Sequence, residues 1–284
     1  MKHVVIIGAG TMGHGIAQVC AMAGLDAHLV DSDPDRVQKG IAHIRANLDK
    51  GIDRGKVTPT EADLAMNRVH ASALEQAATD ADIVIEAIPE HLELKQQVFC
   101  DVARHASPDC IFATNTSSLS ITKIASAIPH PERVIGTHFF NPVHIMTLLE
   151  LVLGQHTSPA VLAQVQALGG RLGKDVIVVQ DMPGFATSRL GVCLGMEAIR
   201  MVEQGVASPS DIDKAMVLGY RHPIGPLKLT DLVGLDVRMA IGTYLAHELE
   251  NPAFEPPRLM REMVEAGRLG KKSGEGFYPW DDHK

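Results

Sequence analysis

The chain has few cysteines, no long apolar segment and no excess of basic residues. Its cysteines lack CxxC pairs and the Cys/His spacing of metal sites, so we expect neither a metal centre nor a disulfide framework; they are Cys20, Cys100, Cys110 and Cys193. The longest apolar runs fall far short of the ~20 residues that cross a bilayer, so we expect no membrane span. The formal net charge of -8 argues against a general nucleic-acid binder, which usually carries a basic face.

The sequence also shows no sign of a leader segment or of internal repeats. The first expected strand begins at Lys2, which leaves no room for a signal or transit peptide. Together with the scattered cysteines, this predicts a cytoplasmic protein. With 284 residues, 45% apolar and 21% charged, the chain has the composition of a soluble globular protein and can bury a substantial core in one or two domains.

The features that are present begin with a strand, a glycine-rich turn and a helix. The β-branched run over 2–7 leads into Gly8-Ala9-Gly10-Thr11-Met12-Gly13, and a helical pattern follows up to Gly24. In such a turn Gly8 allows a tight exit from the strand, Gly10 lets the backbone approach a pyrophosphate, and Gly13 allows close packing of helix and strand. The helix N-terminus then offers free N–H groups and a partial positive charge to the phosphates.

The second expected strand strengthens this interpretation. The segment 26–30 is followed by Asp31, 18 residues after Gly13. A carboxylate at about this distance is typical of a residue that accepts hydrogen bonds from the adenosine ribose hydroxyls. Glycine-rich turns also occur without nucleotides, so it is the spacing to Asp31 that favours a dinucleotide. The carboxylate would repel a 2′-phosphate, and we therefore expect NAD rather than NADP.

Strands and helices alternate through the first two thirds of the chain. We expect one helix over 34–48 and another over 93–105. A third helix should begin at the capping box that Thr58 and Glu61 form. The expected strands cover 82–88, 110–114, 133–139, 148–152 and 176–179. Strands separated by helices predict a parallel sheet with right-handed crossovers.

The pattern changes at Asp181-Met182-Pro183-Gly184, beyond which we find no convincing strand. Helical patterns cover 188–203, a stretch that begins at Ser208, and 227–248. The sequence therefore predicts an α/β fold in which an N-terminal Rossmann-type domain, with a mostly parallel sheet, spans residues 1–181. An all-α C-terminal domain is expected over 182–284.

Apolar residues in the last of these helical stretches bear on assembly. They cannot all lie on one helical stripe, which spans ~100° or somewhat more; they are Leu227, Leu229, Leu232, Val233, Leu235, Val237 and Met239. Some must contact another surface, either the first domain or a second copy of the chain. Symmetric dimers are the commonest oligomers, so we expect a homodimer, with packing inside one protomer as the alternative.

Candidates for chemistry lie where strands end on the carboxyl side of the sheet, since ligands bind there in such folds. Ser117 follows one strand, His138 ends the next, and Glu150 lies in the strand after that. A histidine can take a proton from a substrate hydroxyl near neutral pH, and a carboxylate on its other nitrogen would fix the tautomer. These residue types suit oxidation of an alcohol by hydride transfer. Alone they leave alternatives open, because the chain has 14 histidines, Ser117 could cap a helix and Glu150 could be a solvated strand residue.

Several motifs follow one another in a characteristic order: Gly8-Ala9-Gly10-Thr11-Met12-Gly13, Asn115-Thr116-Ser117-Ser118-Leu119, Gly136-Thr137-His138-Phe139-Phe140-Asn141-Pro142, Glu150-Leu151-Val152, Asp181-Met182-Pro183-Gly184-Phe185 and Gly270-Lys271-Lys272-Ser273-Gly274-Glu275-Gly276-Phe277-Tyr278. Together they resemble the L-3-hydroxyacyl-CoA dehydrogenases, and most of all the bacterial 3-hydroxybutyryl-CoA dehydrogenases. The resemblance covers essentially the whole chain. It implies an oxidoreductase that interconverts a short-chain L-3-hydroxyacyl-CoA and a 3-ketoacyl-CoA with NAD.

The resemblance also implies roles for individual residues. His138 would take the proton of the 3-hydroxyl, Glu150 would orient His138, and Ser117 would hydrogen-bond the reacting oxygen. The implied cofactor contacts are Gly8, Gly10, Thr11, Met12, Gly13, Asp31, Ala87, Ile88, Glu90, Lys95, Asn115, Ser117, Asn141 and Lys271. The implied contacts to an acyl-CoA substrate are Ser117, His138, Asn141 and Ser188, with Lys50, Arg54 and Lys56 as candidates for the coenzyme A phosphates or, alternatively, as solvated surface charge. The second domain would form one wall of the substrate cleft and the dimer interface.

One position departs from the family pattern. The family usually has Asn before the Arg that follows its Pro-Gly-Phe segment, whereas here Ser188 precedes Arg189. A hydroxyl donates one hydrogen bond but is shorter, so a contact to substrate would need a water. Two other functions stay open: an NAD-dependent dehydrogenase of a free sugar acid such as L-gulonate, and a non-catalytic, crystallin-like structural protein. The sequence does not choose between oxidation and reduction as the direction of the reaction.

Overall fold

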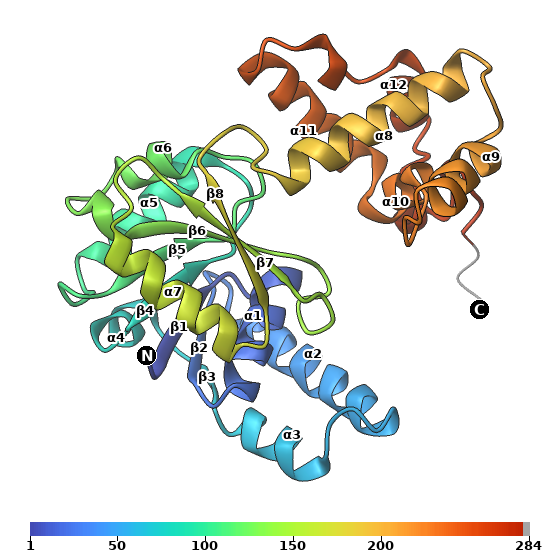
Figure 1. Ribbon diagram of the computed structural model, residues 1–284. Coiled ribbons are helices and arrows are strands. Elements are labelled where there is room, and N and C mark those ends of the chain that lie inside the picture. Colours follow the sequence, from blue (N-terminus) through green and yellow to red (C-terminus); the bar gives the residue numbers. More distant parts are fainter. Residues whose placement is uncertain (281–284) are drawn as a thin grey trace. The chain divides into compact units, whose positions relative to one another are not determined.

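The structure, a computed structural model, describes residues 1–280 and divides the chain into two compact units. The first unit spans Met1–Met182 and the second begins at Pro183, close to the expected change near residue 181 (Figure 1). The first unit contains one eight-stranded sheet with helices, and the described part of the second unit is helical apart from two isolated β-bridges at Glu275. The expected fold class is confirmed.

The sheet of the first unit has the strand order β3-β2-β1-β4-β5-β6-β7-β8. The strands are β1 (His3–Ile7), β2 (Asp26–Val30), β3 (Val69–Ala71), β4 (Ile83–Glu86), β5 (Ile111–Thr114), β6 (Val134–Phe139), β7 (Leu148–Leu153) and β8 (Asp175–Gln180). Neighbours from β3 to β6 pair in parallel, as do β7 and β8. The strand order reverses direction at β1, and in open sheets the crevice at such a point binds ligands.

The pair β6–β7 is antiparallel, so the expectation that helices separate all strands is wrong here. The segment 140–147 connects the two strands without a helix, and the chain therefore reverses directly. This reversal sets His138 opposite Glu150 in the strand register. The sheet as a whole is mostly parallel, as expected.

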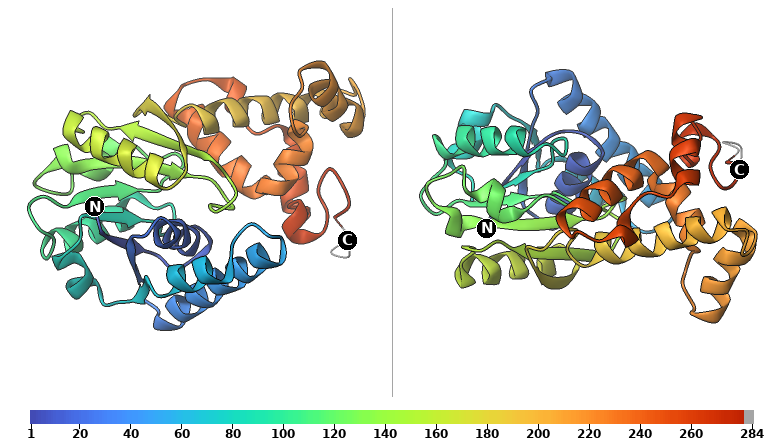
Figure 2. Two further views of the ribbon diagram at one scale, coloured as in Figure 1. Left: turned by 60° about the horizontal axis from the view of Figure 1, so that its bottom comes forward. Right: turned by 90° about the horizontal axis from the view of Figure 1, so that it is seen from above.

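Helices cover both faces of the sheet (Figures 1 and 2). On one face α1 (Thr11–Met22), α2 (Pro34–Asp53), α3 (Pro59–Met66) and α7 (Pro159–Arg171) share a buried core with alternate strand residues such as Val4 and Ile6. The other helices of this unit are α4 (Leu74–Thr79), α5 (Leu92–Ala103) and α6 (Ile121–Ala125). Phe99 of α5 packs edge-on against Phe112 of β5, with ring centroids 5.4 Å apart. Burial on both faces explains the apolar sequences of β1, β4, β5 and β6.

Local signals account for several helix ends. Thr58 and Glu61 form the expected capping box: Oγ1 of Thr58 accepts from the N–H of Glu61, and Oε2 of Glu61 accepts from the N–H of Thr58 at 2.8 Å. Ser208 caps α9 in the same position through the N–H of Asp211. The helix expected over 34–48 extends to Asp53, and the short elements β3 and α4 were not expected.

The second unit contains α8 (Thr187–Glu203), α9 (Pro209–Lys214), α10 (Pro226–Val233), α11 (Leu235–Glu248) and α12 (Arg258–Glu265). The single helical stretch expected over 227–248 is wrong, because Gly234 has φ of 104° and separates α10 from α11. Leu227 and Leu235 are completely buried within this unit, whereas Leu232, Val233 and Val237 are 44%, 42% and 42% exposed. The seven apolar residues thus belong to two helices, and the argument that they cannot share one helical stripe does not hold. Leu232, Val233 and Val237 nevertheless leave apolar surface exposed on this unit.

Three properties of the described chain concern membranes, metals and thiols. Within residues 1–280 no helix is long and apolar enough to span a membrane. Over the same residues no group of three His, Cys, Asp or Glu side chains is arranged to hold a metal ion. All four cysteines are free.

Candidate active site

A cavity of about 560 Å³ lies where β1, β2 and β4 end, at the reversal of strand order. Many of the expected cofactor residues line it: Gly8, Gly10, Thr11, Met12, Asp31, Ala87 and Ile88. The rest of the lining is Ile7, Ser32, Arg36, Pro89, Leu94 and Val98. The apolar walls and few polar groups are typical of a site for an adenine and ribose.

Two glycines of the first turn have no room for a side chain, and the third leaves the backbone open. Gly8 has φ of +101°, and a Cβ on it would lie 2.6 Å from the carbonyl oxygen of Ala87. A Cβ on Gly13 would lie 1.6 Å from the carbonyl oxygen of Gly8, so the helix packs directly on the turn. A Cβ on Gly10 would have no described atom within 4 Å, and Gly10 lines the cavity. The backbone at Gly10 is thus open to close approach, which fits a pyrophosphate at the N-terminus of α1.

Asp31 follows β2 and is held in place by the turn. Its Oδ2 accepts a hydrogen bond from the N–H of Ala9 at 2.9 Å, and its Oδ1 accepts from the N–H of Asp33 at 3.1 Å. Both carboxylate oxygens keep lone pairs for ribose hydroxyls. Arg36, which the sequence analysis did not assign to the site, also lines the cavity, and its Nε lies 3.7 Å from Asp33.

His138 and Glu150 form a buried pair at the end of β6. The Nδ1 atom of His138 lies 2.8 Å from Oε2 of Glu150. His138 is 6% exposed and Glu150 is completely buried. An ionised carboxylate can only accept, so with Glu150 ionised the imidazole donates from Nδ1 in this pair. The ring of Phe140 packs against the imidazole, with centroids 4.4 Å apart.

Asn115 connects the end of β5 to the end of β6. Its Oδ1 accepts from the N–H of Phe139 at 2.9 Å, and its own N–H donates to the carbonyl oxygen of Glu86 at 2.8 Å. The side-chain oxygen of Asn115 therefore positions Phe139, the residue that follows His138 in β6. Asn141 lies exposed just beyond β6.

Lys95 is buried behind this edge of the sheet, and Glu90, whose side chain is 37% exposed, connects it to the turn after β5. Oε1 of Glu90 accepts from the N–H groups of Ser117 and Ser118, at 2.9 and 3.1 Å. Lys95 is 1% exposed, and its Nζ lies 2.6 Å from Oε1 of Glu86 and 3.4 Å from Oε2 of Glu90. These contacts order the turn that carries Ser117.

The other residues predicted to bind substrate or cofactor are not among those that line the cofactor cavity. Lys50 is in the last turn of α2, and Arg54 and Lys56 follow it; all three are exposed and form no ion pair within residues 1–280. In the second unit Ser188 lies half-buried in the first turn of α8. Lys271 lies in the 3-10 turn Lys271–Ser273, with Nζ 5.8 Å from the ring centre of Trp280.

Sequence reasoning missed Glu86, Thr116 and Arg36. Oγ1 of Thr116 donates to Glu90 at 2.5 Å, and Glu86 is the buried acceptor of Lys95. One signal for Glu86 was visible, namely an acid inside the otherwise apolar strand 83–88. Because strand residues there are buried on both faces, an acid at that position must be paired.

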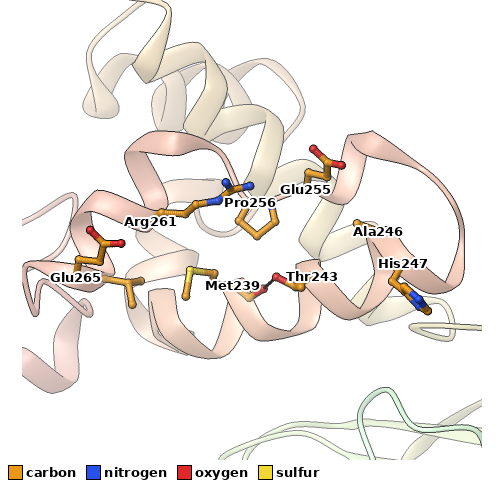
Figure 3. A pocket seen from close by; sticks show the side chains of 9 residues that line it. Met239, Thr243, Ala246, His247, Glu255, Pro256, Arg261 and Glu265 are labelled. Carbon is orange, nitrogen blue, oxygen red and sulfur yellow. Dashed lines mark hydrogen bonds between the residues drawn. The ribbon is translucent and has the colours of Figure 1, made fainter.

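A separate cavity of about 620 Å³ lies in the second unit between α11, α12 and the segment around Pro256 (Figure 3). Met239, Thr243 and His247 line it from α11, and Arg261 and Glu265 from α12. It contains none of the predicted site residues, and its ionisable side chains are Glu255, Glu265, Arg261 and His247. It offers no chemistry comparable to the His138–Glu150 pair.

Comparisons with known proteins agree over the full length. Residues 3–182 match the model of the 3-hydroxyacyl-CoA dehydrogenase NAD binding domain, and residues 184–280 match that of the 3-hydroxyacyl-CoA dehydrogenase C-terminal domain. A probable 3-hydroxybutyryl-CoA dehydrogenase of Bacillus subtilis is 42% identical over 282 residues, which cover 99% of this chain and 98% of the relative. A 3-hydroxybutyryl-CoA dehydrogenase of Mycobacterium tuberculosis is 41% identical, with 99% of each chain covered.

A solved structure gives the same result for the fold. The (S)-3-hydroxybutyryl-CoA dehydrogenase from Ralstonia eutropha superimposes with a TM-score of 0.95 at 43% identity, covering 99% of this chain and 100% of that one. Similarity at this level extends through both units and all the motifs of the sequence. The chain therefore belongs to the 3-hydroxyacyl-CoA dehydrogenase family, whose N-terminal domain binds NAD.

Proposed function

We propose that this enzyme interconverts L-3-hydroxyacyl-CoA and 3-ketoacyl-CoA with NAD, and that its substrate is short, as in 3-hydroxybutyryl-CoA. The observation that carries the proposal is the buried 2.8 Å contact between His138 and Glu150 at the carboxyl edge of a sheet that also holds a dinucleotide cavity. Relatives whose polypeptides match this one over their full length are named 3-hydroxybutyryl-CoA dehydrogenases, which supports a short acyl group in the substrate. The comparisons do not favour a sugar-acid dehydrogenase or a crystallin-like protein.

The cofactor site follows from the residues of the first unit. NAD, when bound, supplies the acceptor for a hydride in oxidation and, as NADH, the donor in reduction. Gly8, Gly10 and Gly13 leave the backbone of the turn open to the pyrophosphate. Thr11 and Met12 begin the helix whose free N–H groups would face the pyrophosphate, and Asp31, which the N–H of Ala9 holds in place, would accept from the adenosine ribose.

His138 acts as the acid and base. In oxidation its Nε2 takes the proton of the 3-hydroxyl while the hydride leaves C3, and the C–O bond becomes a carbonyl; in reduction the same proton returns to oxygen. The proton on Nδ1 is held by Glu150, whose charge stabilises the imidazolium that forms. Burial of the pair strengthens this interaction because little water screens it.

Other residues hold the reactants. We assign Ser117 to a hydrogen bond with the reacting oxygen, Asn141 to the substrate or nicotinamide, and Asn115 to the placement of β6 next to His138. Glu90 and Lys95 support the nicotinamide end of the site through the turn at Ser117. Ser188 and Lys271 are the contributions that we assign to the second unit, to substrate and cofactor respectively.

The coenzyme A moiety and the assembly complete the proposal. We assign Lys50, Arg54 and Lys56 to the coenzyme A phosphates because they are exposed cations without ion-pair partners in the described chain, on a protein of net charge -8.

A homodimer through the second domain is supported by its exposed apolar side chains. Four free, scattered cysteines support a cytoplasmic setting.

The proposal is tested with purified protein and three substrates, each with NAD(H) and with NADP(H): acetoacetyl-CoA, free acetoacetate and L-gulonate. We expect turnover with acetoacetyl-CoA and NADH, and little with the free acids. His138→Gln should lower kcat by about 10²–10⁴ because it removes the general base, with NADH affinity unchanged. His130→Gln is the matched control, since His130 makes an exposed pair with Glu132 at 3.1 Å and should keep full activity. Near-normal turnover in His138→Gln would refute the mechanism.

A further inference from the structure

Glu86 is a completely buried carboxylate that the mechanism above does not use. It ends β4, beside the cofactor cavity. Its Oε1 accepts from the N–H of Ile88 at 2.7 Å and from Nζ of Lys95 at 2.6 Å, and its Oε2 accepts from Oγ1 of Thr114 at 2.7 Å. A buried charge is maintained only when it is paired and hydrogen-bonded, and Glu86 meets both conditions.

Lys95 connects Glu86 to a second carboxylate. Its Nζ lies 3.4 Å from Oε2 of Glu90 and 3.3 Å from the carbonyl oxygen of Ile88, so one buried ammonium is shared unequally between two acids. Burial raises the pKa of the Glu86 carboxyl, and the contacts with Lys95, Thr114 and Ile88 oppose that rise. The shorter distance to Glu86 indicates that Glu86 is the main counter-charge of Lys95.

Glu90 in turn holds the turn that follows β5. Its Oε1 accepts from Oγ1 of Thr116 and from the N–H groups of Ser117 and Ser118. These bonds fix the backbone from which the Ser117 hydroxyl projects. A displacement of the Glu90 carboxylate therefore moves Ser117, which lies far from Glu86 in the sequence.

We propose that Glu86 is a positioning residue for the dehydrogenase reaction, acting through Lys95 and Glu90 on the turn that carries Ser117. The inference rests on the proposed function, in which Ser117 binds the reacting oxygen. When Glu86 carries no charge, as in a glutamine variant, Glu90 is the carboxylate among the described residues that can still pair with Lys95. The ammonium then draws Glu90 toward itself, and the N–H groups of Ser117 and Ser118 lose their acceptor.

The test begins with Glu86→Gln, which keeps the shape and one acceptor oxygen but removes the charge. We expect kcat to fall by about ten- to 100-fold, because small displacements of a reacting group cost that much. The dissociation constant of NADH should change by a smaller factor than kcat, since the Gly8–Gly13 turn and Asp31, which hold the adenosine and pyrophosphate part of the cofactor, are untouched. Such a split between kcat and cofactor affinity does not follow from general destabilisation.

The matched control is Asp82→Asn, at the residue immediately before the same strand. Asp82 also accepts from backbone N–H groups, those of Lys2 and His3, and so its loss destabilises β4 without reaching Ser117. Both variants are assayed at the same temperature interval below their own melting temperatures. A kcat loss in Glu86→Gln no greater than that in Asp82→Asn would overturn the proposal and leave Glu86 a structural residue.

A double-mutant cycle tests the route through Lys95. If Glu86 acts through Lys95, Glu86→Gln should lower kcat in the wild type but by less than about twofold in a Lys95→Met background. The double variant should also melt higher than Glu86→Gln, because in Glu86→Gln a buried ammonium has lost its main counter-charge, whereas the double variant has no ammonium at this position. Equal kcat losses in both backgrounds would overturn the route. The proposed function is judged separately, by wild-type turnover of acetoacetyl-CoA, so the two can fail independently.

Discussion

His138 and Glu150 lie directly opposite each other across the antiparallel β6–β7 pair, with Nδ1 2.8 Å from Oε2. Opposed residues on neighbouring strands have Cβ atoms about 4.5–5.5 Å apart on the same face, so the register itself brings imidazole and carboxylate together. They lie 12 residues apart in the chain, and the 140–147 connection makes the reversal between them. The acid–base pair is thus a product of one strand reversal in an otherwise mostly parallel sheet.

Glu150→Gln should leave the fold intact and lower kcat by about 10²–10⁴, since the amide keeps the shape but cannot stabilise the imidazolium. Stopped-flow turnover with acetoacetyl-CoA, alongside NADH binding and thermal unfolding, measures this. Binding and unfolding should be close to the wild type. A variant that retains more than about a tenth of the wild-type kcat would show that Glu150 is not required to orient His138.

Asp31→Ser should shift preference toward NADP. The carboxylate that repels a 2′-phosphate is removed, and Arg36, which lines the same cavity, is free to approach the phosphate because its contact with Asp33 is 3.7 Å long. We expect the ratio of kcat/KM for NADP over NAD to rise at least about tenfold, which corresponds to ~1.4 kcal/mol. Asp35→Ser, an exposed position in the first turn of α2, is the control and should keep the wild-type ratio.

Much of this site followed from local sequence. Strand-end positions, the glycine turn, Asp31 and the helix caps at Thr58 and Ser208 depend on nearby residues, and the sheet places such strand ends at one edge. The resemblance to a known family added the roles of His138 and Glu150. The parts that sequence missed depend on tertiary contacts instead.

Three misses illustrate the physical reasons. The reversal between β6 and β7 was not expected because apolar strand sequences do not encode the direction of pairing. The strand β3 (Val69–Ala71) is too short for a periodic signal. Gly234 lies within an apolar periodic stretch, and its positive φ, which splits the helix, is visible in three dimensions alone.

Replacing Lys50, Arg54 and Lys56 together by alanine should raise KM for acetoacetyl-CoA about three- to tenfold, since exposed ion pairs contribute ~0.2–1 kcal/mol each. The salt dependence of KM should also weaken, because fewer charges attract the phosphates. Arg45→Ala is the control: Arg45 lies on the same helix but is already paired with Asp49 and Asp63, at 3.0 and 2.8 Å. An unchanged KM in the triple variant would assign the three residues to ordinary surface charge.

The free energy of unfolding should fall below neutral pH, in part because of His28. Burial and the neighbouring His70 and His3 lower the pKa of His28, and Asp26 and Asp80 only partly oppose them. The neutral imidazole, whose Nδ1 lies 2.9 Å from Oγ of Ser72, is thus favoured in the folded state. Its contribution is complete above the unfolded pKa of about 6.5 and is lost as the pH falls through that value, since the unfolded chain then binds more protons. Urea unfolding at pH 5.5 and 7.5 should show a smaller difference in His28→Gln than in the wild type; equal differences would contradict this role.

The last prediction concerns assembly. Leu232, Val233 and Val237 lie at the end of α10 and the start of α11, on either side of Gly234, and each is more than two fifths exposed in the single chain. A contact with a second copy would bury this apolar surface, and symmetric dimers are the commonest way to do so. Sedimentation at micromolar concentration should therefore give about twice the chain mass of 30.6 kDa. Val233→Asp with Val237→Asp should shift the mass toward the monomer, whereas Leu64→Asp, which changes an exposed leucine of α3 in the first unit, should not. A wild-type mass near 30.6 kDa would end the dimer proposal, and a dimer that persists in the double aspartate variant would place its interface on another surface.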